Sequence, residues 1–155
     1  MKNLLLLLAS LLLISCGPDL DDTKELDAIL EEALPEEKVQ RRGGKNEKLY
    51  FETDKQEPYT GWLKVMHANG QVQGLAHVKE GKRHGPLLMW YENGQKAAEI
   101  QNKEGEMITA KGWLPDGSDC PITDIQNGTG TIIIYHESGK ERRRQLFKNG
   151  SEVFN

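Results

Sequence analysis

Four histidines, two cysteines and several acidic residues beside glycines are the side chains of this sequence that could do chemistry. Two of the histidines, His67 and His136, share one position of an internal repeat with Tyr91, and this exchange favours packing over metal binding. Neither HExxH nor GxSxG nor a Walker loop is present, and Cys120 has no nucleophile signature around it. The sequence therefore predicts a protein that is not an enzyme and that has no metal site and no cofactor.

Cys16 belongs to a different kind of chemistry, because it follows an export signal. The apolar run over residues 4–14 is too short to span a bilayer, so residues 1–15 are expected to be a cleaved signal peptide. The sequence LISC at 13–16 resembles the bacterial lipobox, in which the cysteine is acylated and becomes the N-terminus. The alternative is an ordinary signal that happens to precede a cysteine. Gly17 replaces the Asp that some bacteria use for inner-membrane retention, so we expect a lipid anchor in the outer membrane.

Composition limits the remaining classes of protein. The chain has 155 residues and a formal net charge of −4, which becomes −5 when Lys2 leaves with the signal. Nucleic-acid binders are normally basic, so an acidic chain exported to the envelope is not expected to bind nucleic acid. With Cys16 acylated, Cys120 has no partner for an intramolecular disulfide.

Residues 16–48 are charged and rich in helix-breaking residues, which is typical of a solvated tether. Within this range, Asp22 and Glu25 have the spacing of a capping box, apolar residues follow at helical spacing, and Pro35 ends the run. We therefore expect a lipid-anchored tether that contains a short helix over about 22–34.

Three stretches of the chain share one glycine spacing, in which the second glycine follows the first by nine positions and the third follows the second by eleven. Asn-Gly favours a type I′ turn, whose two central residues both have positive φ, so each stretch is expected to be a β-hairpin. A degenerate copy fits residues 106–128. The outer glycines of the three copies are Gly61 and Gly81, Gly85 and Gly105, and Gly130 and Gly150. The turns between them are Asn69-Gly70, Asn93-Gly94 and Ser138-Gly139.

Apolar residues alternate along the first arm of each hairpin, which predicts strands with one buried face. One hairpin cannot bury that face alone, but stacked hairpins can cover each other. We predict an all-β fold, an extended antiparallel meander of stacked hairpin repeats over residues 49–155, in which residues 49–51 open the sheet.

The repeat resembles that of the bacterial MORN-variant repeat proteins. The likeness is carried by GWLKVMHANGQVQGLAHVKEG, GPLLMWYENGQKAAEIQNKEG and GTIIIYHESGKERRRQLFKNG, and it covers about residues 49–151. Many members are labelled antitoxins of the YwqK type, so the resemblance implies a non-catalytic envelope protein whose repeat sheet binds a protein, such as an antitoxin or immunity protein that occludes a toxin. The alternative is a structural envelope component associated with glycan or peptidoglycan.

Two groups of residues are candidates for contact with a partner. Arg142 and Arg144 are expected to share one face of the last hairpin, with Arg143 on the other. They indicate either a patch for an anionic partner or an edge strand protected by charge from aggregation. The second group consists of Trp62, Trp90 and Trp113, which suit either partner contact or the core.

Overall fold

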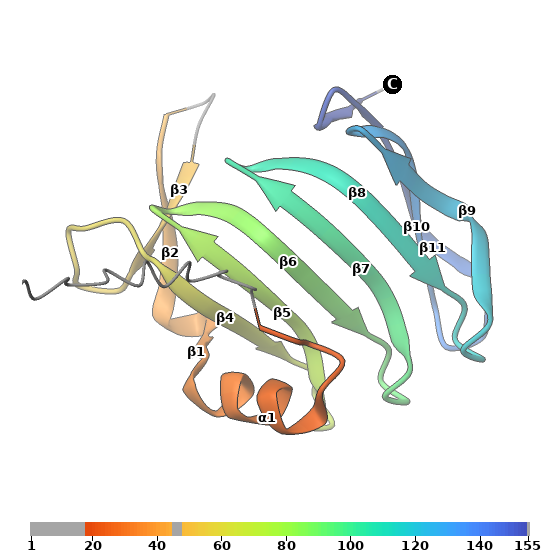
Figure 1. Cartoon of the computed structure of the whole chain (residues 1–155), viewed down its shortest axis with the longest axis horizontal. Helices are drawn as coiled ribbons and strands as arrows, with labels where there is room; N and C mark the ends of the chain where they lie inside the picture. The colour runs from red at the N-terminus through yellow and green to blue at the C-terminus, as the bar shows by residue number, and fades with distance from the viewer. Residues whose placement is uncertain (1–17, 45–47, 155) are drawn as a thin grey trace, which may run out of the picture.

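The computed structural model describes residues 18–44 and 48–154. Ten strands form one sheet, in which β4 to β12 follow chain order and each strand is antiparallel to the next (Figure 1). The predicted all-β meander is confirmed. The strands from β4 onward are β4 (Gly61–Met66), β5 (Val72–Lys79), β6 (Lys82–Trp90), β7 (Lys96–Lys103), β8 (Glu106–Trp113), β9 (Asp119–Gln126), β10 (Thr129–Tyr135), β11 (Glu141–Lys148) and β12 (Ser151–Val153).

The sheet does not open at residues 49–51, so that prediction is wrong. Its first strand is β1 (Leu34–Pro35), which runs parallel to β4. Residues 49–51 belong to β3 (Lys48–Glu52), which pairs with β2 (Val39–Gly43) in a separate two-stranded sheet. Between β1 and β2 lies the short 3₁₀ helix η1 (Glu36–Lys38).

The predicted short helix is α1 (Thr23–Glu32), and it packs on the sheet. Its N-terminus is capped by Asp22, whose Oδ1 accepts hydrogen bonds from the backbone N–H groups of Lys24 and Glu25 at 2.8 and 3.4 Å. Lys64 of β4 donates from Nζ to the carbonyl oxygen of Leu30 at 2.7 Å. The first part of the stretch that sequence composition assigned to a solvated tether, residues 18–35, is therefore folded against the strands.

Small side chains are interspersed with large ones from strand to strand on one face of the sheet. The sheet curls toward this face, so that β10 and β11 lie behind β8 and β9 in Figure 1. We call it the concave face and the opposite one the convex face. In register across β4 to β9, one row of the concave face consists of Leu63, Ala76, Leu87, Ile100, Ala110 and Ile125. The row beside it consists of Val65, Gly74, Met89, Ala98 and Gly112.

The turns at Asn69-Gly70, Asn93-Gly94 and Ser138-Gly139 are not of type I′, because only their glycines have positive φ. In the first of them, His67 N donates to Gln71 O at 2.8 Å and Gly70 N donates to His67 O at 3.0 Å, which closes a three-residue loop. The type I′ geometry occurs at the opposite end of the sheet. There both residues of each pair have positive φ, namely Glu80-Gly81, Glu104-Gly105, Asn127-Gly128 and Asn149-Gly150.

The turn asparagines connect successive hairpins. Asn69 Oδ1 accepts from Gln71 N at 3.0 Å within its own turn, while its Nδ2 donates to Glu92 O of the next turn at 3.0 Å. Asn93 makes the same two bonds. Its Oδ1 accepts from Gln95 N at 3.0 Å, and its Nδ2 donates to Pro115 O at 2.8 Å. The final turn carries Ser138 at this position and has no following turn of this kind in the sheet.

The degenerate copy continues the sheet as β8 and β9. Its turn has the same hydrogen bonds as the others, from Leu114 N to Ser118 O at 2.8 Å and from Gly117 N to Leu114 O at 2.9 Å. Gly112 of β8 is a packing position. A Cβ atom there would meet Thr123 Cγ2 at 2.6 Å.

Candidate functional site: a trough on the concave face

The curl of the sheet hollows its concave face into a trough between β4–β6 on one wall and β10–β11 on the other. The central part of the trough has a volume of about 560 Å³. Three exposed arginines also line it, Arg41, Arg83 and Arg143, together with Glu152. Its floor is apolar and includes Val65, Leu87, Met89, Ile100, Ile132, Ile134 and Phe147.

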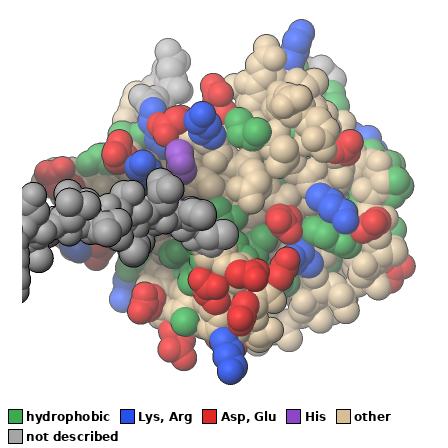
Figure 2. Space-filling model, viewed as in Figure 1, with side chains coloured by type: hydrophobic (Ala, Val, Ile, Leu, Met, Phe, Trp, Pro, Cys, Tyr) green, Lys and Arg blue, Asp and Glu red, His purple; other side chains and the backbone are tan. Residues whose placement is uncertain are grey.

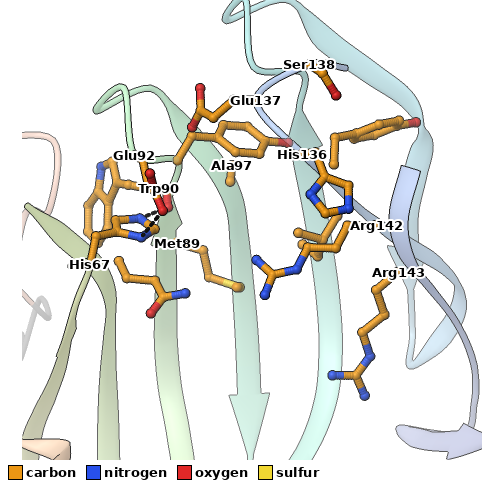
Figure 3. A pocket seen from close by; sticks show the side chains of 14 residues that line it. His67, Met89, Trp90, Glu92, Ala97, His136, Glu137, Ser138, Arg142 and Arg143 are labelled. Atoms are coloured by element: carbon orange, nitrogen blue, oxygen red, sulfur yellow. Dashed lines mark hydrogen bonds and ion pairs between the residues drawn. The ribbon is translucent and has the colours of Figure 1, made fainter. Parts of the chain in front are cut away.

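The trough continues into a second hollow of about 540 Å³ at the end of the sheet with the three-residue turns (Figure 3). In Figure 3, His67 and Glu92 lie on one side of this hollow, and Arg142 and Arg143 lie on the other. Residues from two repeat positions line it, His67, Tyr91 and His136 from one and Gln73, Ala97 and Arg142 from the other. The two hollows share Gln73, Met89, Ile134 and Arg143, so they form one continuous surface.

The second of these repeat positions is a β-bulge. In three hairpins the strand register shifts by one residue, and the extra residue is Gln73, Ala97 or Arg142. Each lies three positions after its turn glycine. The sequence analysis did not identify this position, although its constant distance from the turn glycine was a signal that could have located it.

The bulge overturns the expected arrangement of the three arginines. Arg142 and Arg143 line the trough together, because the extra residue interrupts the strict alternation of side chains. Arg144 is held elsewhere by Glu141, in hydrogen bonds of 3.0 Å from Nε and 2.8 Å from Nη2. The hydrogen bond from Arg144 lowers the pKa of Glu141 below its ordinary value.

The charge of the other two arginines is only weakly compensated. Arg143 Nη2 lies 3.8 Å from Glu152 Oε1, at the outer limit for an ion pair. Among the described residues, no carboxylate forms an ion pair with Arg142. The β11 wall of the trough is therefore cationic.

His67 and Tyr91 are interchangeable because they make equivalent hydrogen bonds in successive hairpins. His67 Nε2 lies 2.9 Å from Trp90 O, and the Tyr91 hydroxyl donates to Trp113 O at 2.8 Å. Each ring thus connects its own hairpin to the backbone of the next. Within residues 18–44 and 48–154, no three His, Cys, Asp or Glu side chains converge in a way that could hold a metal ion.

Cys120 lies on β9 and is buried, with 4% of its surface exposed. Its Sγ lies 3.5 Å from Thr123 Oγ1 and 3.5 Å from the Tyr135 hydroxyl. Burial raises the pKa of this thiol, but the hydrogen bonds with Thr123 and Tyr135 outweigh burial and lower the pKa below its ordinary value. The same contact with Cys120 raises the pKa of Tyr135 to about 12.

The three tryptophans do not form one surface. Trp62, at the start of β4, packs edge-on to His77 with ring centroids 5.0 Å apart. The Trp113 ring lies 5.4 Å from Lys96 Nζ and 5.0 Å from Lys111 Nζ, in cation–π contacts. Trp90 ends β6, which runs in the same direction as β4, so Trp62 and Trp90 lie at opposite ends of the sheet.

The N-terminal part of the described chain lies on the convex face. Residues 18–21 lie beside Pro86 and Leu88, and Asp21 Oδ1 is 3.4 Å from Lys96 Nζ. Acidic side chains gather over this segment and α1 (Figure 2). The predicted signal peptide at 1–15 and Cys16 lie outside the described residues.

The fold and its surface define an all-β repeat protein with an apolar trough that is cationic along one wall. Comparisons with family models, curated proteins and solved structures found no match to the chain. In the part of the chain that the structure describes, no helix has both the length and the apolar character needed to cross a membrane.

Proposed function

We propose that this chain is a lipid-anchored, non-catalytic protein of the bacterial cell envelope that binds another protein in its trough. In its most specific form, suggested by the resemblance to MORN-variant proteins, it is an antitoxin or immunity protein that occludes a toxin. The observation that carries the proposal is the trough itself, a continuous hollow to which β4 to β8, β10 and β11 contribute side chains or backbone.

The chemistry of the trough suits a protein partner. Val65, Leu87, Met89 and Ile134 on its floor are only partly buried, so a bound partner would remove further apolar surface from water. Such burial contributes about 25 cal/mol per Å² of apolar area. Arg142 and Arg143 supply charge beside this floor, and arginine next to an apolar centre is typical of protein interfaces.

The position of the anchor supports a partner that comes from the aqueous side. Cys16 precedes Pro18 by two residues, and a chain of that length spans at most about 7 Å. Because residues 18–21 lie on the convex face, acyl chains on Cys16 would leave from that side. The trough then opens away from the membrane, where a soluble protein has access to it.

The alternative, a glycan- or peptidoglycan-associated component, receives less support from the geometry. Sugars bind on exposed aromatic faces, but of the three tryptophans only Trp90 lines the trough, and the Tyr91 ring beside it is buried. The Trp113 ring is also in contact with two lysines. The observations therefore favour a protein partner.

The test is a cross-linked pulldown from membranes with two matched variants. Gln145→Trp fills the trough, which Gln145 lines, while Gln126→Trp places the same bulk on the convex face. We expect recovery of a specific protein partner to fall about tenfold with Gln145→Trp, a loss of about 1.4 kcal/mol, and to stay unchanged with Gln126→Trp. Equal recovery with both variants, or no specific partner with the unsubstituted protein, would contradict the proposal.

A further inference from the structure

The outer edge of β11 is only partly covered. Its neighbour β12 has three residues, Ser151–Val153, and it pairs with β11 only from Leu146 to Lys148. Among the described residues, no strand pairs with the outer edge of β11 over residues 141–145. This stretch is the open end of the whole meander.

The backbone of the open stretch presents hydrogen-bonding groups outward. Asn149-Gly150 forms a two-residue turn, so Lys148 and Ser151 beside it form a hydrogen-bonded pair. Backbone groups alternate in direction along a strand, so the N–H and C=O of Leu146 face β12 as well. By the same alternation those of Arg144 point outward, beyond the last residue of β12 that pairs with β11.

The side chains of residues 141–145 determine which kind of strand can pair with this edge. Arg142, Arg143 and Arg144 are all exposed. Two copies of this edge would place arginines opposite each other, and like charges across a strand pair are destabilising. An acidic segment would instead find complementary charge at Arg142 and at Arg143, whose contact with Glu152 is long at 3.8 Å.

The trough determines the side-chain pattern of such a segment. A strand added beside β11 has one set of alternate side chains on the concave face, next to Arg143 and above the apolar floor. The other set lies on the convex face beside Arg144. The exposed side chains of Leu146 and Val153, 40% and 44% accessible, lie on that convex side of the edge, because Leu146 alternates with Gln145 and Phe147 of the trough.

We propose that an extended acidic segment of a protein partner adds to the sheet as a strand along residues 141–145 of β11. Its carboxylates lie on the concave face and contact Arg142 and Arg143, and its alternate apolar side chains lie on the convex face beside Leu146 and Val153. Main-chain hydrogen bonds supply affinity in this mode, and side-chain contacts supply specificity. The inference rests on the proposed function in one respect, that the partner is a protein.

Amide hydrogen exchange of the mature, acylated protein in nanodiscs tests the inference. The probe is an end-capped eight-residue peptide of alternating valine and glutamate. At saturating peptide, we expect exchange within residues 141–145 to slow by about tenfold at the outward-facing Arg144 amide, because a new main-chain hydrogen bond protects it. A peptide of alternating valine and lysine, and the valine–glutamate peptide with methylated backbone nitrogens, are expected to give no protection.

Two double variants distinguish the effect of charge on β11 from the effect of the protein's net charge. Arg142→Glu with Arg143→Glu should abolish the protection. Lys79→Glu with Lys103→Glu makes the same change in net charge at exposed positions on β5 and β7 and should leave it intact. No slowing over 141–145, or equal slowing with the lysine peptide or the methylated peptide, would overturn the inference and leave β11 as an edge protected by its charge.

The outcome is distinguishable from failure of the proposed function. If the peptide gives no protection while Gln145→Trp still loses the partner in the pulldown, strand addition is wrong and the trough remains the binding site. If the peptide protects residues 141–145 but membranes yield no protein partner, the edge accepts strands and the proposed function is wrong.

Discussion

At the scale of single residues, the asparagine of each Asn-Gly pair contributes more by connecting successive hairpins than by setting the geometry of its own turn. The sequence located these turns correctly, because Asn and Gly are rare together outside turns. It assigned the wrong reason, since Asn69 and Asn93 do not have positive φ and instead bond to the next hairpin. Local turn preferences cannot reveal a hydrogen bond to a residue more than twenty positions away.

Asn93→Asp tests this role. The aspartate keeps an acceptor for Gln95 N, but it has no Nδ2 donor. The carbonyl of the buried Pro115 therefore loses its hydrogen bond from residue 93. We expect the free energy of unfolding to fall by about 1–2 kcal/mol in urea denaturation. Ser138→Asp is the control, because the last turn has no successor, and it should change stability by less than about 0.5 kcal/mol. Equal losses at both sites would show that the asparagine does not connect hairpins.

At the scale of the elements, the sequence predicted the hairpins but not the features that shape the trough. Period-two alternation and glycine spacing locate β4 to β11, because both are local. The bulge at Gln73, Ala97 and Arg142 depends on how two strands pair, so the simple alternation of residues 142–144 gave the wrong faces. The two-residue strand β1 is too short to leave any periodic signal.

The degenerate hairpin gives a matched test of packing between β8 and β9. Gly74 and Gly112 lie in the same row of the concave face, and neither has positive φ. A Cβ atom would lie 3.7 Å from its nearest neighbour at Gly74 but 2.6 Å from Thr123 Cγ2 at Gly112. Gly112→Ala should lower the melting temperature and cost about 1–3 kcal/mol, whereas Gly74→Ala should be close to neutral. Similar melting temperatures would mean that β9 does not pack on β8 as described.

At the scale of the whole molecule, the main difference from the sequence analysis is the stretch before the repeats. Its composition is that of a tether, yet α1 docks through Leu30 and Lys64, and β1 pairs with β4. These contacts join residues about thirty positions apart, so local composition could not indicate them. If Cys16 carries the lipid anchor that we propose, the convex face is held close to the membrane.

Cys16→Ala tests the anchor. The substitution removes the thiol that we propose is acylated, and the described residues contain no helix able to replace the acyl chains as a membrane anchor. We expect the variant to lose labelling by an alkyne fatty acid and to move from the membrane fraction to the soluble fraction. Retention of both label and membrane association would contradict lipidation at this cysteine.

The central claim is that the trough is the surface that binds a protein partner. Its most direct test is position-resolved photocross-linking in living cells, with a photoreactive phenylalanine analogue placed at Gln145 in the trough or at Gln126 on the convex face. The account predicts one discrete protein adduct from position 145 and none from position 126. The same adducts from both positions, or an adduct from position 126 alone, would contradict it.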